Sequence, residues 1–196
     1  NPTMVTNTGL CAGPINVTVT DADGCSTSAA AAVTQPDTLT VSVVGNDASC
    51  NGGSDGDAAA TPAGGTSAIA YNYDWVDQST GGSISNASTA TGLAAGTYCV
   101  TITDDNLCTA TQCVTIAEPD PIVVTTAWTD ANCGQADGTI SVATITGGSG
   151  IYPSETWVDA TPNPVADINA VIAGTYTVTI TDDQGCTGTS VATVSD

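Results

Sequence analysis

The chain has 196 residues and contains no Lys, Arg or His against 18 Asp and 2 Glu, so its formal net charge at neutral pH is −20. A chain without cationic side chains cannot neutralise phosphates, which excludes nucleic-acid binding and attraction to anionic membranes. Hydrophobic residues nevertheless make up 41% of the chain, with a mean hydropathy of +0.14, which is enough apolar content for folded domains.

The chain repeats itself with a period of about 80 residues, the size of a small β-domain. The run INVTVTDADGC at 15–25 returns as YCVTITDDNLC at 98–108 and as YTVTITDDQGC at 176–186. Proline junctions close the first two repeats, at 35–37 and 118–121. This organisation predicts three domains, namely the C-terminal part of a β-sandwich at 1–36, a complete β-sandwich at 37–119, and a complete or nearly complete one at 120–196.

Aliphatic residues alternate with Thr inside each repeat, as in Val17-Thr18-Val19-Thr20 and Val178-Thr179-Ile180-Thr181. This period of two predicts strands with one apolar face and one Thr face, because the branched Cβ of Thr suits a pleated surface. Turns rich in Asp, Asn and Gly separate the runs, and no segment keeps a helical period. In chain order, the predicted strands of the two larger domains are 38–45, 57–64, 70–76, 82–90, 96–103, 108–117, 121–128, 139–146, 151–158, 165–171, 174–181 and 186–194.

Short strands, a central Trp and a Gly-Thr-Tyr sequence entering the penultimate strand predict an all-β fold of tandem immunoglobulin-like (PKD-like) β-sandwich repeats. Trp75 and Trp157 are predicted core residues, one in each larger repeat. Tyr98 and Tyr176 are predicted to be tyrosine corners, with ordinary core packing as the alternative.

Three motifs recur in this frame: GLAAGTYCVTITD at 92–104, CNGGSDG at 50–56, and the closing Glu-Pro or Gln-Pro. Together they resemble the SprB-type repeat of very large cell-surface adhesins of gliding and related Bacteroidota, over nearly the whole chain. The resemblance implies an extracellular array that is exported by the type IX secretion route, serves attachment and has no catalytic residue. The residues that match the two cysteine positions of the family are Cys50, Cys108, Cys133 and Cys186, whereas Cys99 and Cys113 are additional and Leu107 replaces a turn glycine.

Eight cysteines with repeat-locked spacing, without a Cys-x-x-Cys motif or any His, indicate disulfides in an oxidising compartment and hence an extracellular or cell-surface location. Cys99 and Cys113 lie opposite each other across a predicted hairpin centred near residue 106. Both are absent from the third repeat, where Thr177 and Val191 take their places. We therefore predict a cross-strand disulfide between Cys99 and Cys113.

Two pairings stay open for the other six cysteines. Pairing inside repeats would join Cys50 to Cys108 and Cys133 to Cys186, leaving Cys11 with Cys25. In a sandwich with immunoglobulin strand order, however, Cys50 and Cys108 lie at opposite ends of strands that span roughly 23 Å, which is too far for a disulfide. The short proline junctions favour junction disulfides Cys11–Cys108 and Cys50–Cys186 instead, with Cys25 and Cys133 paired to repeats outside the chain.

Acidic residues are predicted to gather at the same junctions, because the last hairpin of each repeat should face the preceding linker. Calcium or another divalent ion is the one cofactor that these carboxylates suggest, since clustered carboxylates repel one another and the chain offers no side-chain cation. No complete calcium-loop consensus occurs, and solvated turn carboxylates are the alternative. The candidate ligands are Glu118, Asp120, Asp182 and Asp183 at one junction and Asp37, Asp104 and Asp105 at the other.

Catalysis is not expected, because a chain without His or Lys has no ordinary base for a Ser or Cys nucleophile. Two functions remain. The first is a structural, load-bearing repeat module of a large secreted cell-surface adhesin or extracellular filament. The second is a ligand-binding adhesion module with a glycan or protein site in its loops. The turns of the repeats are similar and carry no individual site, which favours the structural role.

The expected partners are neighbouring repeats of the same long chain and, for the parent protein, a cell-surface or glycan target. Small side chains would permit close packing in a homo-oligomeric fibre, whereas charge of one sign opposes it unless ions intervene. Apolar runs such as 29–33 are too short to cross a bilayer, so no membrane insertion is expected. Neither terminus resembles a signal peptide or an anchor, which suggests a piece of a longer exported protein.

Overall fold

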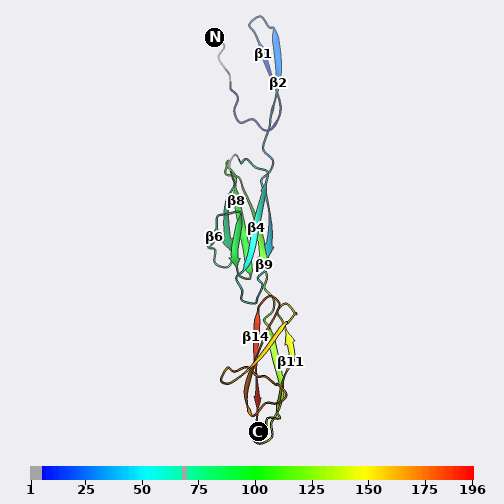
Figure 1. Cartoon of the computed structure of the whole chain (residues 1–196). Coiled ribbons are helices and arrows are strands. Elements are labelled where there is room, and N and C mark those ends of the chain that lie inside the picture. Colours follow the sequence, from blue (N-terminus) through cyan, green and yellow to red (C-terminus); the bar gives the residue numbers. More distant parts are fainter. Residues whose placement is uncertain (1–5, 68–69) are drawn as a thin grey trace.

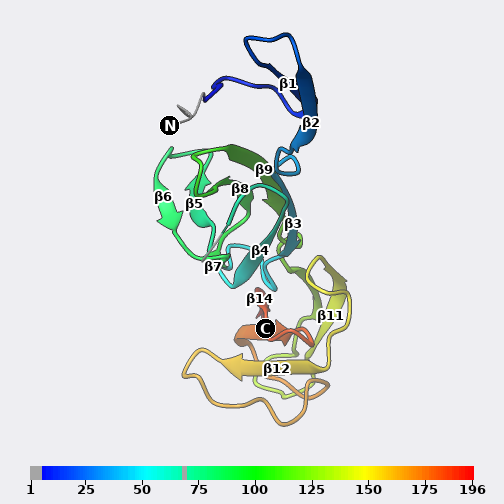
Figure 2. The same ribbon diagram turned by 90° about the horizontal axis from the view of Figure 1, so that it is seen from above.

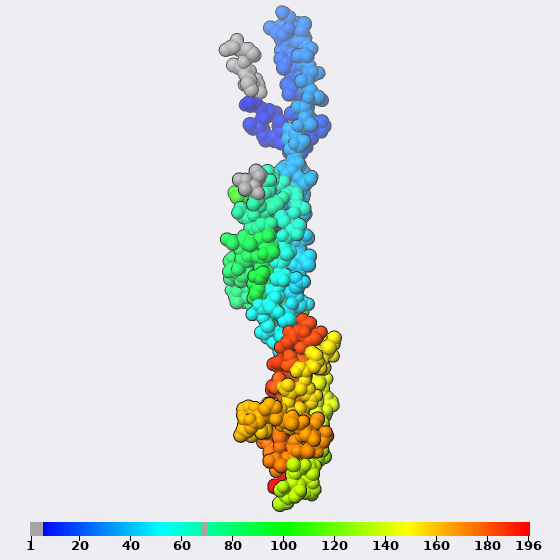
Figure 3. Space-filling view, viewed as in Figure 1, coloured from blue at the N-terminus to red at the C-terminus, as the bar shows by residue number. Residues whose placement is uncertain are grey.

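The computed structural model describes residues 6–67 and 70–196, so residues 1–5 of the predicted first domain lie outside it. All regular structure in this part of the chain is β, and no helix there is long and apolar enough to cross a membrane. Three units follow one another along a rod, with the segment of residues 13–33 at one end of the molecule and the C-terminus at the other (Figure 1, Figure 3).

The first unit is an isolated antiparallel hairpin of β1 (Gly13–Thr20) and β2 (Ser26–Val33). By sequence it corresponds to the last two strands of each later repeat. Its apolar face is open, with Val17 54% and Val19 61% exposed, whereas their counterparts Val100 and Ile102 are fully buried. The alternating pattern therefore forms the strands locally, and the rest of a sandwich is needed to bury them.

The second unit is a two-layer sandwich of antiparallel strands. One sheet has the order β3-β4-β7 and the other the order β6-β5-β8-β9; from above, the two layers lie on opposite sides of the unit (Figure 2). This strand order is that of an immunoglobulin-like β-sandwich. Its strands are β3 (Thr40–Asn46), β4 (Gly56–Ala63), β5 (Asn72–Asp77), β6 (Ser83–Ser85), β7 (Thr89–Leu93), β8 (Gly96–Thr103) and β9 (Thr109–Ile116).

The third unit has the same plan with fewer strands. One sheet pairs β10 with β11, and the other has the order β12-β13-β14. A register shift between Thr125 and Thr126 lets β10 approach the opposite sheet, where Thr126 Oγ1 donates to the carbonyl of Val191, 2.9 Å away. Its strands are β10 (Val123–Thr129), β11 (Thr139–Thr146), β12 (Ser154–Asp159), β13 (Gly174–Thr181) and β14 (Thr187–Val194).

Each sandwich closes over its own core, built around one tryptophan. Trp75 is fully buried and Trp157 is 6% exposed, and both pack against aliphatic side chains of the last two strands of their repeat. The two tyrosines form the predicted corners. The Tyr98 hydroxyl donates to the carbonyl of Ala94 at 3.0 Å, and the Tyr176 hydroxyl donates to that of Ile172 at 2.8 Å.

One predicted strand, 82–90, is in fact two. The chain leaves the sheet of β5 after β6 and joins the sheet of β4 as β7. Two hydrogen bonds hold this crossing. Ser85 Oγ donates to the carbonyl of Thr89 at 2.8 Å, and the indole Nε1 of Trp75 donates to the carbonyl of Ala87 at 3.1 Å. The indole therefore fixes the point where the chain changes layers.

The predicted strand at 165–171 is wrong. This segment is irregular and meets its neighbours at separate points. There are isolated bridges between Val158 and Pro164 and between Gly138 and Val171, and Ile140 N–H donates to the carbonyl of Ile168 at 2.9 Å. Pro164 has no N–H to give to a ladder. Farther along, the Asp167 carboxylate accepts the backbone N–H of Asn169 at 2.8 Å, which turns the chain away from an extended path.

Candidate functional site: a cross-linked repeat junction

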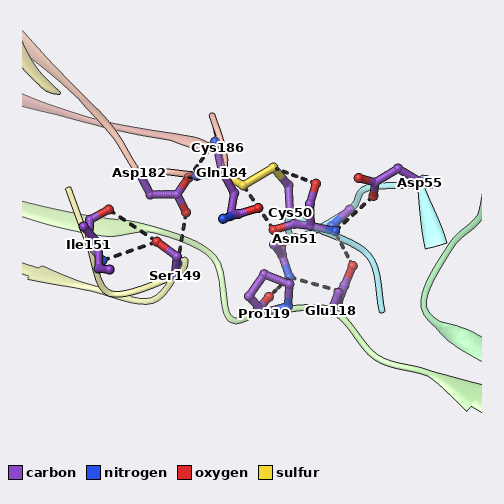
Figure 4. The surroundings of a disulfide bond; sticks show 12 residues. Cys50, Asn51, Asp55, Glu118, Pro119, Ser149, Ile151, Asp182, Gln184 and Cys186 are labelled. Atoms are coloured by element: carbon purple, nitrogen blue, oxygen red, sulfur yellow. Dashed lines mark hydrogen bonds between the residues drawn. A yellow bond between two sulfur atoms is a disulfide. The ribbon is translucent and has the colours of Figure 1, made fainter. Parts of the chain in front are cut away.

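The strongest chemical feature of the molecule is a disulfide between two repeats. Cys50, in the loop between β3 and β4, is bonded to Cys186, in the hairpin between β13 and β14, with a Cα–Cα distance of 5.5 Å (Figure 4). This is the junction pairing that the strand order favours. The pairings of Cys50 with Cys108 and of Cys133 with Cys186 are therefore wrong, because each would have to join opposite ends of one sandwich.

Hydrogen bonds tie the loop of Cys50 to the linker between the repeats. The Glu118 carboxylate accepts the backbone N–H of Gly52 at 2.6 Å and the side-chain amide of Asn51 at 3.0 Å, and the same amide donates to the carbonyl of Pro119. Ala48 N–H donates to the carbonyl of Ala117 at 2.9 Å. The loop and the linker thus form one body, from which Cys50 faces the next repeat.

The last hairpin of each larger repeat is locked by a buried aspartate. Asp182 Oδ1 accepts the backbone N–H groups of Gln184 and Cys186, and its Oδ2 accepts that of Ser149 in the loop after β11. These bonds close the turn on itself and fasten it to the neighbouring loop. The lock therefore fixes the position from which Cys186 reaches the preceding repeat.

The second repeat has the same lock. Asp104 Oδ1 accepts the backbone N–H groups of Asn106 and Cys108, and its Oδ2 accepts that of Thr66 at 2.9 Å. The N–H of Thr66 is the largest influence on the pKa of the Asp104 carboxyl and lowers it; burial raises this pKa, and the N–H groups of Cys108 and Asn106 lower it again. The net pKa lies below the ordinary value, so the carboxylate stays ionised.

For Asp182, burial is the largest influence and raises the pKa of the carboxyl. The backbone N–H groups of Ser149, Cys186 and Gln184 outweigh burial and hold the pKa below its ordinary value. Both locks therefore depend on a negative charge that is neutralised by backbone dipoles rather than by a cation.

Most of the residues predicted to bind calcium have other roles in the structure. Pairs of them do lie near each other, since Asp37 and Asp104 line one recess and Asp120 lies beside the turn of Cys186. Within residues 6–67 and 70–196, however, no three His, Cys, Asp or Glu side chains are grouped so that they could hold a metal ion. Asp104 and Asp182 accept backbone N–H groups and Glu118 holds the linker, while Asp105 and Asp183 are exposed in the turns. The expected carboxylate cluster is thus not assembled.

The structure contains the predicted Cys99–Cys113 disulfide, which joins directly opposite residues of β8 and β9. The predicted Cys11–Cys108 disulfide is absent. In the described part of the chain Cys11, Cys25, Cys108 and Cys133 are all unpaired and exposed. Cys11 corresponds by repeat alignment to Ala94 and not to Cys50, so it lies in the wrong loop to reach Cys108.

The sequence analysis missed two glycines, one at each junction, that allow the linker to pack closely against the repeat. Gly64 and Gly147 have φ of 73° and 83°, and a Cβ there would collide with the carbonyl oxygens of Thr38 and Pro121 in the linkers. Their own carbonyls accept tyrosine hydroxyls, from Tyr71 at 2.7 Å and Tyr152 at 2.6 Å. The sequence signal for these two glycines is a repeated motif, Gly-Gly-Thr at 64–66 and Gly-Gly-Ser at 147–149.

One recess lies away from the junctions, on the third repeat. It has a volume of about 520 Å³ and is formed by the irregular segment 160–173, which projects from the side of the rod in orange in Figure 3. Asp159, Asp167 and Tyr176 are among the residues that line it. The side-chain hydroxyl of Thr161 and the N–H groups of Asn163 and Thr161 hold the pKa of the Asp159 carboxyl below its ordinary value. Burial first, and the charge of Asp159 second, raise the pKa of the Tyr176 phenol.

No protein-family model and no curated protein sequence matches the chain. Among solved structures, it is similar to the N-terminal eight Ig domains of Down Syndrome Cell Adhesion Molecule isoform 1.30.30, with 13% identity over 93% of this chain and 26% of that one and a TM-score of 0.46. The amphioxus IgVJ-C2 molecule covers 67% of this chain at 12% identity, over 92% of its own length, with a TM-score of 0.27. The 47-kilodalton lipoprotein Tp47 of Treponema pallidum covers 81%, at 12% identity, over 51% of its own length, with a TM-score of 0.25.

The chain spans about a quarter of the length of the first of these structures. At TM-scores this low, the likenesses carry no weight for function. The assignment of an immunoglobulin-like fold rests on the strand order of the two sheets.

Proposed function

We propose that this chain is a load-bearing section of a tandem-repeat stalk in a large secreted cell-surface adhesin or extracellular filament. The observation that carries the proposal is the Cys50–Cys186 disulfide, which joins consecutive repeats across a junction already held by the linker hydrogen bonds. A covalent junction in a rod of similar repeats suits a protein that transmits tension over a distance.

The position of this disulfide determines how many residues of the chain can be extended under tension. Its sequence separation is 136, and it bridges from the first loop of one repeat to the last hairpin of the next. Force applied at the two chain ends passes through the sulfur atoms and bypasses nearly all of both sandwiches. The repeats would then transmit load without having to resist unfolding themselves.

The resemblance to SprB-type repeats supports the wider setting of this role. It implies a Bacteroidota adhesin exported by type IX secretion, and two disulfides agree with a non-reducing environment such as the cell exterior. The partners would be neighbouring repeats, a second chain in a fibre, and the surface or glycan that the parent protein grips. The role needs no catalysis, consistent with a chain that has no His or Lys.

The decisive experiment is to pull single molecules of the whole chain from its two ends. With disulfides intact, we expect no lengthening from residues 51–185. In the Cys50→Ser, Cys186→Ser variant the same segment is released, and the added length is roughly 40 nm at about 3.4 Å per residue, with the Cys99–Cys113 loop still closed. Replacing the unpaired Cys11 by Ser is the control. Release of that length in the wild-type chain would show that the junction does not carry the load.

The recess on the third repeat favours a second candidate, a ligand-binding adhesion module. A volume of about 520 Å³ lies within the range of small-ligand sites. Its two carboxylates suit a neutral or cationic ligand that offers hydrogen-bond donors, such as a neutral oligosaccharide. Titration of the chain with neutral oligosaccharides, followed by NMR, tests this. Shifts confined to 159–176 and lost in Asp167→Ala would support the module, and the absence of any shift would refute it for this ligand class.

A further inference from the structure

The surroundings of Cys108 copy those of the bonded Cys186. Cys108 N–H donates to Asp104 Oδ1 at 2.8 Å, as Cys186 N–H does to Asp182 Oδ1. The adjoining glycines repeat as well, because Gly65 N–H donates to the linker carbonyl of Asp37 at 2.8 Å, and Gly148 N–H donates to that of Asp120 at 2.8 Å. The hairpin cysteine is thus held in the same frame at both junctions.

A recess lies beside each hairpin cysteine. At the bonded junction, Cys50 and Asn51 of the preceding repeat form part of its wall. At the other junction the wall is built from the corresponding residues of the second repeat and its linker, without any residue of a first-strand loop. The matching lining residues include Asp37, Leu39, Gly65, Cys108 and Thr109 at one junction and Asp120, Ile122, Gly148, Cys186 and Thr187 at the other. Cys108 therefore lies in a formed socket into which the loop of a preceding repeat would fit.

The loop of Cys133 copies the loop of Cys50 in the same way. Its base is held by Ala131 N–H donating to the carbonyl of Ser195 at 2.8 Å and by Ser195 N–H donating to Asp130 Oδ1 at 2.9 Å. The corresponding bonds in the second repeat join Ala48 to Ala117, at 2.9 Å, and Ala117 to Asp47, at 2.8 Å.

The tip of that loop is fixed by one more repeated bond. Asn132 N–H donates to Asp137 Oδ1 at 2.8 Å, as Ser49 N–H does to Asp55 Oδ1 at 3.0 Å. The side-chain amide of Asn132 and its N–H hold the pKa of the Asp137 carboxyl below its ordinary value. Cys133 is thus presented at the far end of the third repeat on a loop of the same build as the one that bears Cys50.

We propose that Cys108 and Cys133 each form a further junction disulfide of the Cys50–Cys186 type. Cys108 takes the place of Cys186 in one of them, and Cys133 takes the place of Cys50 in the other. Cys108 receives a first-loop cysteine from a repeat on its N-terminal side, and Cys133 receives a hairpin cysteine from a repeat on its C-terminal side. The partner is in each case a repeat of this same build. This inference deepens the proposed stalk function and rests on it, since it makes the covalent junction a property of every joint.

The bond can form by thiol–disulfide exchange with a small-molecule disulfide such as oxidised glutathione. The thiolate of one cysteine attacks a glutathione sulfur, and one glutathione leaves as the thiol. The second cysteine thiolate then attacks the mixed disulfide and releases the other glutathione. Two protein thiols are oxidised, one disulfide of glutathione is reduced to two thiols, and the protons pass to these leaving groups.

Disulfides at every junction would interleave. The Cys50–Cys186 bond encloses Cys133, whose own partner would lie beyond Cys186, so consecutive links overlap along the chain. Under tension, the path of force would leave one link at a hairpin cysteine and enter another at the next first-loop cysteine. That interval is 25 residues, as from Cys25 to Cys50 and from Cys108 to Cys133, in a repeat period near 80. Only that short length, in every two repeats, would be extensible.

The test is to append a second copy of residues 119–196 directly after Asp196, so that Ser195 and Asp196 precede the linker proline where Ala117 and Glu118 precede it at the natural junction. After oxidation with glutathione disulfide, we expect peptide mapping to find Cys133 joined to the appended copy of Cys186. When excess reduced glutathione then removes glutathione from single thiols, iodoacetamide should label the exposed Cys11 but not Cys133 of the original repeat. Cys133→Ser should restore labelling of the appended hairpin cysteine, and Cys11→Ser should change nothing.

Labelling of Cys133 after oxidation, or its recovery with any cysteine other than the appended one, would overturn the inference. This failure is separable from failure of the stalk function, because the pulling experiment concerns only Cys50 and Cys186 in the original chain. A chain that bypasses 51–185 under force but leaves Cys133 free would keep the stalk and lose the repeated link.

Discussion

The second and third repeats share the residues that form their cores and their junctions, but they differ in the strands and loops at the sides of the sandwich. Both have a buried tryptophan, a tyrosine corner, a glycine packed against the linker and an aspartate lock. The second repeat adds β6, β7 and a cross-strand disulfide, whereas the third has an irregular segment and no disulfide of its own. The shared residues are those that form a core and a junction, so the flank is free to vary without changing how repeats connect.

The tryptophans test whether each repeat is a separate cooperative unit. Trp75→Ala and Trp157→Ala should each destabilise their own repeat by about 3–5 kcal/mol, because a large buried ring leaves a cavity. Trp128 is 47% exposed on β10, so Trp128→Ala is a matched control with little expected effect. Hydrogen exchange resolved by mass spectrometry locates the loss. Simultaneous loss of protection in both repeats after one substitution would show that the two behave as one unit.

The cross-strand disulfide tests the difference between the flanks. Replacing Cys99 by Thr and Cys113 by Val gives the second repeat the residues that the third repeat has at the same pairing. For a sequence separation of 14, the loss should be about 3 kcal/mol.

The reverse change, Thr177→Cys with Val191→Cys, places two cysteines at the paired positions of β13 and β14. It should stabilise the third repeat, as chemical denaturation would measure. Equal stability of the second repeat with and without its disulfide would mean that the hairpin is already fixed by packing alone.

The local features of these repeats could be predicted from the sequence, and the features that depend on a neighbour only in part. Alternation predicts the hairpin strands, and pairing across one turn predicts Cys99–Cys113, because each of these features lies within a single hairpin. The Cys50–Cys186 bond followed from strand order and repeat phase. Cys11 was misplaced because its match in the next repeat is Ala94, and only the repeat phase reveals that.

The acidic turns have a role that neither the predicted metal site nor solvated turn carboxylates describe. Asp21, Asp104 and Asp182 each precede the hairpin cysteine by four residues and accept its N–H, so their carboxylates serve the turn rather than a metal site. The strand expected at 165–171 failed for a similar reason, because a local side-chain bond at Asp167 and the proline at 164 oppose the extended chain.

The aspartate locks predict a pH dependence at both junctions. Because the folded-state pKa of Asp182 lies below its unfolded value of about 3.9, its carboxylate stabilises the fold above about pH 4, and this contribution is lost as the pH falls through the folded-state pKa. Asp182→Asn should therefore lower the thermal midpoint of the third repeat at neutral pH. The difference from the wild type should shrink below pH 4.

Asp183→Asn changes the charge equally at the exposed neighbouring position, so it controls for the relief of repulsion in a chain of net charge −20. Asp104→Asn should behave like Asp182→Asn, but in the second repeat. A difference between Asp182→Asn and the wild type that does not depend on pH would show that the lock does not rely on ionisation.

The smallest expected effect concerns the hairpin turn itself, where the repeats differ by one residue. Leu107 has φ of 65°, whereas Gly24 and Gly185 stand at the same turn position with φ of 88° and 87°. A side chain in this left-handed region is strained, and Leu107 is 82% exposed, so it gains little from packing. Leu107→Gly should stabilise the second repeat by about 0.5–1 kcal/mol, after the greater freedom of glycine in the unfolded chain is counted.

Leu107→Ala removes the same exposed side chain but keeps the strain, so it should bring no such gain, and Gly185→Ala should cost the third repeat a similar amount. Chemical denaturation of the three variants decides the matter, and equal stability of Leu107→Gly and Leu107→Ala would contradict it. Because this turn sets the position of Cys108 one residue later, relief of the strain should leave the cysteine in its socket and the junction unchanged.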